Sequence, residues 1–334
     1  MSLRFLGNSL KLENVYILGA GITGGLLEHQ GPLSSYIDHY YEDYYCQQES
    51  FEKAERAMIK DAYHICLSKT DLRERDIDVY IGGDLMNQNT TMNYFARDLM
   101  KPFIGIYSAC ASFSLSVALG SLFIEAGCFE NVMSLISSHN LTAERQFRYP
   151  SEYGVQRRET STFTATGAVA TLLSSTKSKI KVESVTLGRV VDYKQNDPND
   201  MGRAMAPAAY DTIANHFKDL SRTYKDYDLI VTGDLSEYGH KILETMLKED
   251  EPQMDNYDDC GRMLYDRKNQ EVFQGGSGCA CSAMVTMGFI YNQMLKGTYK
   301  RVLVVATGAL LSPLMLAQKE TIPSVAHAFV LEVV

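Results

Sequence analysis

The chain has 334 residues, of which 45% are hydrophobic and 22% charged, with 24 Gly and 8 Pro. This length allows about two domains' worth of structure, and the composition supports a sizeable core without a low-complexity tract. The formal charge of −9, from 41 acidic and 32 basic residues, argues against nucleic acid as a partner.

No apolar stretch is long enough to cross a bilayer. The longest apolar or small-residue run, at 302–311, has ten residues, against roughly 20 for a transmembrane helix. Residues 1–12 mix Arg4, Asn8 and Lys11 with apolar residues and lack the apolar core of a secretory signal. We therefore expect cytoplasmic synthesis without a cleaved signal. Seven cysteines, an odd count, fit a reducing compartment better than a disulfide framework.

The first half of the chain alternates helices with strands. A helix predicted at 52–69 precedes a strand in 76–85 (DIDVYIGGDL), and a helix at 111–126 precedes a strand in 127–142 (GCFENVMSLISSHNLT). Residues 166–172 (TGAVATL) predict one more strand. The helix at 111–126 is almost wholly apolar or small, which is typical of a helix buried on all sides.

Cys110 lies between a strand-like run and the first turn of the 111–126 helix. The N-terminal end of a helix offers unpaired N–H groups and a positive dipole end, which lower the pKa of a thiol and attract an anion. Cys110 is therefore a candidate nucleophile or anion-site residue. A small buried cysteine packed at a strand–helix corner agrees equally well with the spacing.

The polar segment 137–150 (SSHNLTAERQFRYP) follows a strand and contains His139 and Arg145. Strand ends rich in hydrogen-bonding side chains often bind ligands, and arginine can bind a carboxylate through two hydrogen bonds. Both residues are candidate ligand-binding residues. The alternative is a polar loop tied by its own ion pairs to Glu144 and Glu152.

The second half repeats the pattern of the first. Residues 226–235 (DYDLIVTGDL), 297–312 (GTYKRVLVVATGALLS) and 326–332 (AHAFVLE) match the three strand segments above at offsets of 150, 170 and 160. Helices are predicted at 208–220, 241–248 and 282–295. The rise from 150 to 170 predicts an insertion, which we assign to the polar stretch 248–267.

A glycine-rich turn, QGGSGCACS at 274–282, precedes the second apolar helix. Three glycines and two serines suit a loop whose backbone N–H groups converge on a ligand, so Ser277 and Gly278 are candidate ligand-binding residues. Cys279 and Cys281 are one residue apart with no second Cys or His pair nearby, which is poor zinc spacing. We predict no metal site and no cofactor.

His327 precedes the last predicted strand, between small residues. A single histidine in such a context is more often structural than catalytic. The matched segments together predict an α/β fold made by duplication, with halves at 1–176 and 177–334. The helices at 111–126 and 282–295 occupy equivalent places, and we expect them back to back at the centre, between two sheets.

The duplicated halves, the cysteine at the head of one central helix and the glycine-rich turn before its twin resemble the thiolase superfamily, which includes ketoacyl synthases. A closer resemblance is to the stage V sporulation protein AD family of endospore-forming bacteria, and it runs through essentially the whole chain. It is carried by MGRAMAPAAYDTIANH (201–216), SSHNLTAERQFRYPSEYG (137–154), FQGGSGCACSA (273–283), RVLVVATGALLSP (301–313) and IPSVAHA (322–328).

This resemblance implies a thiolase-like αβαβα layered sandwich that binds dipicolinic acid, pyridine-2,6-dicarboxylate. It also implies a homodimer that lies peripherally on the spore inner membrane, with the integral membrane proteins of the stage V sporulation A complex as partners. The machinery moves dipicolinic acid during sporulation and germination. The candidate ligand-binding residues are Cys110, Ala111, His139, Arg145, Ser277, Gly278 and His327, although the family commonly has Ser where this chain has Ala111.

The resemblance also implies a protein without catalysis. Condensing enzymes have a catalytic His just after the strand that matches 228–233, where this chain has Asp234, Leu235, Ser236 and Glu237. They also use an Asn or His in the later glycine-rich turn, and residues 272–283 contain neither. Two alternatives remain open: an acyltransferase that uses Cys110 with His139 or His327 as base, and an assembly scaffold with a vestigial pocket.

Overall fold

The computed structural model describes residues 4–147 and 157–334. Its centre is a sheet whose strands follow the path β5-β4-β6-β8-β2-β9-β14-β13-β10-β11. The first half contributes β2 (Tyr16–Gly24), β4 (Val79–Gly83), β5 (Phe103–Gly105), β6 (Asn131–Ser138) and β8 (Gly167–Ser174). The second half contributes β9 (Ile180–Thr186), β10 (Leu229–Thr232), β11 (Tyr257–Asp259), β13 (Arg301–Ala309) and β14 (Ser324–Val333).

The two halves of this path have the same pattern of pairing. In the first, β4 pairs in parallel with β5 and β6, and β8 is antiparallel to β6 and β2. In the second, β10 pairs in parallel with β11 and β13, and β14 is antiparallel to β13 and β9. The internal repeat predicted from the sequence is therefore present in the fold.

Equivalent strands also have the predicted spacing. The starts of β4 and β10 differ by 150 residues (229 − 79), and those of β6 and β13 by 170 (301 − 131). An aspartate just before β4 and its equivalent before β10 fix the next parallel strand in the same way. Asp78 accepts hydrogen bonds from the N–H groups of Glu130 and Asn131, and Asp228 from those of Lys300 and Arg301.

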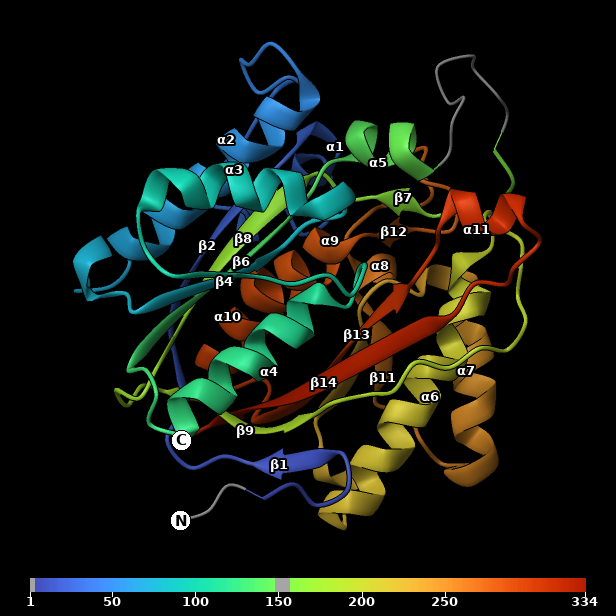
Figure 1. The fold of residues 1–334 in the computed structure, drawn as a ribbon. Coiled ribbons are helices and arrows are strands. Elements are labelled where there is room, and N and C mark those ends of the chain that lie inside the picture. The colour runs from blue at the N-terminus through green and yellow to red at the C-terminus, as the bar shows by residue number, and fades with distance from the viewer. Residues whose placement is uncertain (1–3, 148–156) are drawn as a thin grey trace.

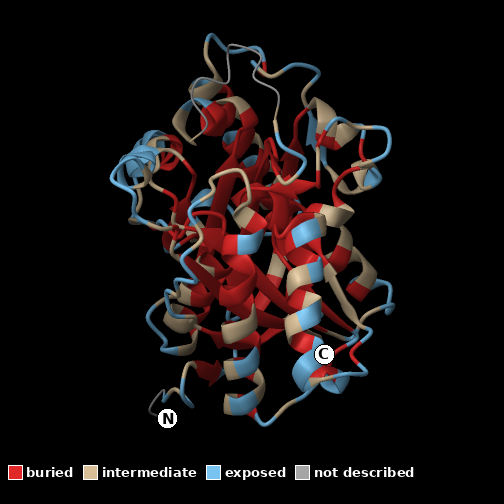
Figure 2. Ribbon diagram, turned by 90° about the vertical axis from the view of Figure 1, so that its right-hand side faces the viewer, coloured by how far each residue is buried: buried red, intermediate tan, exposed pale blue. Residues whose placement is uncertain are grey.

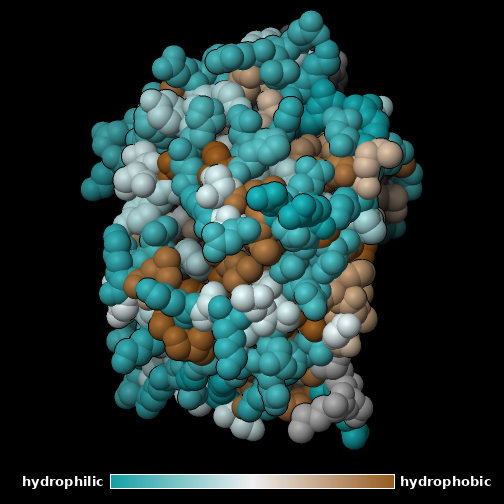
Figure 3. Space-filling view, turned by 90° about the vertical axis from the view of Figure 1, so that its left-hand side faces the viewer, coloured by the Kyte–Doolittle hydropathy of each residue, from teal (hydrophilic) through white to brown (hydrophobic). Residues whose placement is uncertain are grey.

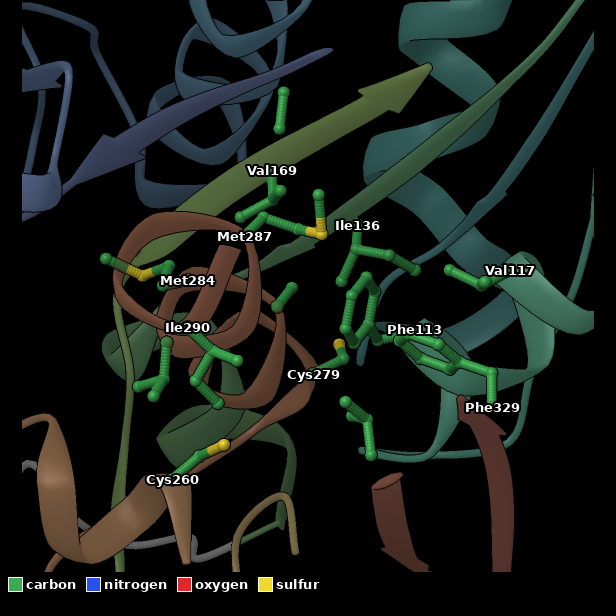
Figure 4. Packing of buried hydrophobic residues seen from close by; sticks show 14 of the residues in the cluster. Phe113, Val117, Ile136, Val169, Cys260, Cys279, Met284, Met287, Ile290 and Phe329 are labelled. Carbon is green, nitrogen blue, oxygen red and sulfur yellow. The ribbon is translucent and has the colours of Figure 1, made fainter. Parts of the chain in front are cut away.

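The two apolar helices lie side by side at the centre, as predicted. They are α4 (Ser112–Glu125) and α9 (Cys279–Met284), which continues through a π-helical segment (Val285–Ile290) into α10 (Tyr291–Leu295). Helix α4 packs against β6 of its own half and β14 of the other, and α9 packs against β6, β8 and α4. Figure 4 shows Phe113 of α4 beside Phe329 of β14, with ring centroids 5.5 Å apart.

Amphipathic helices cover the outer faces, so the layers are αβαβα (Figure 1). Helices α2 (Phe51–Ser68) and α3 (Thr90–Leu99) cover the first half, and α6 (Met201–Leu220) and α7 (Ser236–Asp250) cover the second. Figure 2 shows buried strands and central helices inside outer helices whose solvent side is exposed. The fold is a thiolase-like layered α/β structure.

Short elements complete the chain. They are β1 (Ser9–Lys11), β3 (His39–Tyr40), β7 (Phe163–Thr164), β12 (Gly276–Ser277), α1 (Leu26–His29), α5 (Asn140–Phe147), α8 (Cys260–Met263) and α11 (Pro313–Ala317). In the described part of the chain, no helix is both long enough and apolar enough to span a membrane. Figure 3 shows one face on which apolar patches are broken up by hydrophilic side chains.

The structure corrects several details of the sequence prediction and leaves the domain boundary untested. The two sheets are joined, because β2 and β9 pair at Tyr16–Lys181 and Ile17–Ile180. The boundary at 176/177 falls in the β8–β9 connection and, as a division into domains, stays a prediction. The helix predicted at 208–220 begins at Met201, where Asp200 caps it, and continues through Pro207.

The insertion lies only partly where it was predicted. The start of β11 is 154 residues after that of β5 (257 − 103), so four of the twenty extra residues precede β11 and sixteen follow it. Most of the insertion therefore lies between β11 and α9, in a segment that begins with α8 inside the predicted stretch 248–267 and continues beyond it toward the glycine-rich turn. For the polar segment 137–150 the sequence offered a loop as the alternative. Its described residues form the end of β6 and helix α5, which continues as far as Phe147.

Gly308 of β13 sets how closely the Cys110 turn approaches the second half. A Cβ at Gly308 would lie 2.3 Å from the Ser108 carbonyl oxygen and 3.0 Å from the Ala111 nitrogen. We expect Gly308→Ala to lower the free energy of unfolding by about 1–3 kcal/mol, the usual cost of overpacking a core. Urea denaturation measures this, with Gly105→Ala as the control because its nearest neighbour would be 3.4 Å away. Equal stability of the two variants would contradict the argument.

Candidate ligand-binding site

A narrow pocket beside Cys110 lies between the two halves. Its walls are Leu85, Tyr107, Ala109, Cys110, Ala143, Glu144, Phe147 and Thr164 of the first half and Met201, Ser277, Ala309 and Leu311 of the second. The walls are mostly apolar, with a few polar groups among them. The centre of a water molecule can occupy about 30 Å³ of the pocket, which is room for about two waters.

The Cys110 turn is fixed by its own hydrogen bonds. The Ala111 N–H donates to the Ser108 carbonyl oxygen at 3.0 Å, and the Ser112 hydroxyl donates to the Ala109 carbonyl oxygen at 2.8 Å. Ala111 is fully buried and does not line the pocket. The Ala111 N–H is therefore already used within the turn, and a role of Ala111 in ligand binding stays a prediction.

The glycine-rich turn brings Ser277 to the pocket. Strand β12 pairs in parallel with β7, so that Ser277 is opposite Thr164, and the Ser277 hydroxyl lies 4.0 Å from the Cys110 sulfur. Gly278 has φ of +99°, and a Cβ there would lie 2.9 Å from the Ser138 hydroxyl. Glycine is thus required at 278, whereas Ser277 and Cys110 are the two predicted site residues that meet in the pocket.

Asp234, which was not among the predicted site residues, lies behind this pair. Its carboxylate is fully buried and accepts hydrogen bonds from the hydroxyls of Thr307 at 2.5 Å and Ser277 at 3.3 Å. Burial raises its pKa to about 6, although these hydroxyls and the Gly278 N–H oppose the rise. The sequence did contain a signal for Asp234, the Gly-Asp-Leu that occurs at the same place in both halves. Asp84, the equivalent residue of the first half, is also buried.

The Cys110 thiol is protonated at neutral pH. Burial raises its pKa well above the usual value, and the charge of Asp234 raises it further. Of the readings of Cys110 left open by the sequence, this disfavours a thiol activated by the helix end, because desolvation and a neighbouring carboxylate act against the dipole.

Neither candidate histidine bonds to Cys110. His327 donates from Nε2 to the Ser108 hydroxyl at 3.2 Å and accepts from the Gly188 N–H at 3.2 Å. His139 donates from Nε2 to the Tyr44 carbonyl oxygen at 2.8 Å. Burial lowers the pKa of both rings to about 4, so both are neutral at physiological pH. Neither ring lines the pocket.

Arg145 points away from the pocket toward α2. It pairs with Glu52, and its guanidinium lies over the Phe51 ring, 5.4 Å from the centroid. Successive residues of a helix differ in direction by about 100°, so Arg145 leaves α5 on another side from Glu144, which lines the pocket. The sequence offered ion pairs of this segment with Glu144 and Glu152 as an alternative. Arg145 pairs with Glu52 and not with Glu144. Glu152 lies outside the described residues.

Glu144 instead pairs with Arg157, a residue that sequence reasoning missed. The Arg157 Nη2 lies 2.7 Å from the Glu144 carboxylate, which is 2% exposed. The two positions are 13 residues apart (157 − 144), a spacing that fits neither a helix period nor a strand period, so no sequence signal links them.

Within 4–147 and 157–334, no group of three or more His, Cys, Asp or Glu side chains is placed to hold a metal ion. The Cys279 thiol donates to the Ser137 carbonyl oxygen at 3.1 Å. All seven cysteines lie in the described residues and are unpaired.

Comparison with known proteins decides the family. The family model described as stage V sporulation protein AD matches residues 8–332. Stage V sporulation protein AD of Bacillus subtilis (strain 168) is 50% identical over 319 residues, which cover 95% of this chain and 94% of that protein. This chain belongs to the stage V sporulation protein AD family.

Solved structures share the fold of this stage V sporulation protein AD family member at low identity. The 3-oxoacyl-[acyl-carrier-protein] synthase III of Aquifex aeolicus VF5 is 12% identical with a TM-score of 0.58, over 95% of this chain and 99% of that one. Human mitochondrial 3-ketoacyl-CoA thiolase, in complex with CoA, is 12% identical with a TM-score of 0.57 over all of both chains. These likenesses establish the fold alone.

The state of the Cys110 thiol can be tested by alkylation. With iodoacetamide at pH 7.5 we expect Cys110 to react at least about tenfold more slowly than Cys128, the exposed cysteine, because the thiolate is the reactive form. Asp234→Asn should speed the labelling of Cys110, since it removes a negative charge. Peptide mapping by mass spectrometry gives both rates, and labelling of Cys110 as fast as Cys128 would contradict the raised pKa.

Proposed function

We propose that the pocket beside Cys110 binds dipicolinate and that the protein serves sporulation as a ligand-binding component without acyl transfer. The observation that carries the proposal is the pocket itself. Leu85, Phe147 and Leu311 give it apolar walls, and Ser277 and Thr164 give it hydroxyls. A flat aromatic ring with carboxylates needs this combination of surfaces. Membership of the family supports the ligand's identity.

The ligand needs more room than the pocket has. Space for about two waters is too little for a pyridine ring with two carboxylates. Tyr107 is 45% exposed and Phe147 is only partly buried, so these side chains are the ones able to turn outward. The N-terminal end of α6, at Met201, adds the positive end of a twenty-residue helix dipole to the pocket wall.

Several features favour binding over catalysis. Acyl transfer by cysteine needs a thiolate, a base within hydrogen-bond reach and oxyanion donors. Here burial raises the pKa of Cys110, its neighbours are Asp234 and Ser277, and His139 and His327 have other partners. The Ala111 N–H is occupied as well. The acyltransferase reading is correspondingly weak.

The proposal extends to location and assembly. We infer a peripheral place on the spore inner membrane, held by the integral membrane proteins of the stage V sporulation A complex, where the machinery moves dipicolinate in sporulation and germination. We also infer a homodimer formed through the first half. Strand β5 supports this, because it is an edge of the sheet and the nearby Met100 is 89% exposed.

Titration calorimetry tests ligand binding. We expect dipicolinate to bind the wild-type protein at millimolar concentration or below, and more tightly than phthalate, which lacks the ring nitrogen. Leu311→Trp fills the pocket and should weaken binding at least about tenfold. Leu314→Trp is the matched control, because Leu314 is 67% exposed on the neighbouring helix. Absence of dipicolinate binding by the folded wild-type protein would leave the scaffold reading.

Asp234 predicts a pH dependence of dipicolinate affinity. Its pKa of about 6 means that the carboxyl is mostly protonated below that pH and ionised above it. An ionised Asp234 repels a dianion in the pocket, so affinity should fall about tenfold as the pH rises from about 5.5 to 7.5. Asp234→Asn is the control, because any effect of pH on the ligand itself is the same for this variant, which cannot ionise at position 234. An equal slope in both proteins would contradict this role.

Acyl-CoA followed by intact mass tests the absence of acyl transfer. We expect no acyl adduct on Cys110 after incubation with acetyl-CoA, since the thiol is protonated and has no imidazole partner. Stoichiometric acylation that disappears in Cys110→Ser would support the acyltransferase alternative instead.

A further inference from the structure

We propose that Arg157 binds a carboxylate of the ligand by exchanging its ion pair with Glu144 for one with the ligand. This inference rests on the proposed function and names the residue that makes the pocket selective for an aromatic dicarboxylate. The sequence pointed to Arg145 for this role, whereas the structure pairs a different arginine with Glu144 of the pocket lining.

The geometry of the Glu144–Arg157 pair supports the exchange. Glu144 is the one charged side chain in the pocket lining within the described chain, and it is 2% exposed. The Arg157 guanidinium lies 2.7 Å from it and keeps 24% of its side chain exposed. The arginine therefore contacts the buried carboxylate and keeps part of its side chain open to solvent.

Arg157 is also held in place without Glu144. Its guanidinium lies over the ring of Phe273, 5.5 Å from the centroid, just before the glycine-rich turn that carries Ser277. A stacked guanidinium keeps free N–H edges, and it binds carboxylates through a planar pair of donors. Release from Glu144 would thus leave Arg157 oriented for the ligand.

Electrostatics explain why the exchange favours a dicarboxylate. A dianion beside Glu144 and Asp234 meets two acidic groups, so it needs a cation that those groups do not fully occupy. A ligand with one carboxylate that is hydrogen-bonded by Ser277 would not reach Arg157. A ligand with a second carboxylate across the ring would replace Glu144 as its partner.

The experiment compares dipicolinate with picolinate, which has one carboxylate, by titration calorimetry at one pH. We expect Arg157→Ala to weaken dipicolinate binding at least about tenfold and to weaken picolinate binding much less, so that the ratio of their affinities collapses. Arg157→Lys should restore part of the ratio. Arg158→Ala is the matched control, since Arg158 is adjacent, 67% exposed and paired with Asp197; it should bind both ligands as the wild type does.

Glu144→Gln separates exchange from a merely structural ion pair. Removing the competing carboxylate should leave dipicolinate binding equal to that of the wild type or tighter. If the ion pair were only structural, substitution of either Glu144 or Arg157 would weaken dipicolinate binding. Thermal melts establish that each variant is folded, and Arg157→Lys replaces Arg157→Ala if the latter is not. Equal affinity ratios in wild type and Arg157→Ala, or weakened binding by folded Glu144→Gln, would overturn the exchange. If wild type binds no dipicolinate, the proposed function fails instead.

Discussion

The structure depends on the burial of two helices that are apolar on every side. Most residues of α4 and all residues of α9 are buried, and each helix packs against strands and against the other helix. Duplication of one βαβ-rich half makes this packing possible, because it supplies equivalent helices and two joined sheets. The two helices begin close together, as Cys279 of α9 and Phe113 of α4 show in Figure 4. Cys110 and Ser277, which precede these helices, line the pocket. The site is thus a consequence of how the core is filled.

Small residues bring the two halves close enough to form that site. Gly308 of β13 packs on the Cys110 turn, and Gly83 and Gly233, which are equivalent, pack on Ser112 and Ser282 of the central helices. Because no side chain intervenes, Cys110 of one half and Ser277 of the other lie 4.0 Å apart. The same closeness desolvates Asp234, which is why an acid and a thiol here have raised pKa values.

The electrostatic character of the pocket differs from what a reactive cysteine requires. The chain shares its fold with proteins whose names describe synthases and thiolases, yet the groups nearest Cys110 are a carboxyl and a hydroxyl. A fold fixes where side chains converge, and the side chains decide the chemistry. In this family member the convergence brings together the thiol of Cys110, the hydroxyl of Ser277 and the carboxylate of Glu144, which Arg157 neutralises.

The sequence by itself determined the architecture, because repeated strands with offsets of 150 and 170 and two wholly apolar helices leave few ways to bury the core. It also placed Cys110 and Ser277 just before the two central helices, which is why they lie close together in the fold. Tertiary structure decided the rest. The direction of a side chain on α5 depends on how that helix docks, so Arg145 turned to Glu52 while Glu144 took Arg157. The role of Asp234 depended likewise on burial from both halves, a property that no local pattern encodes.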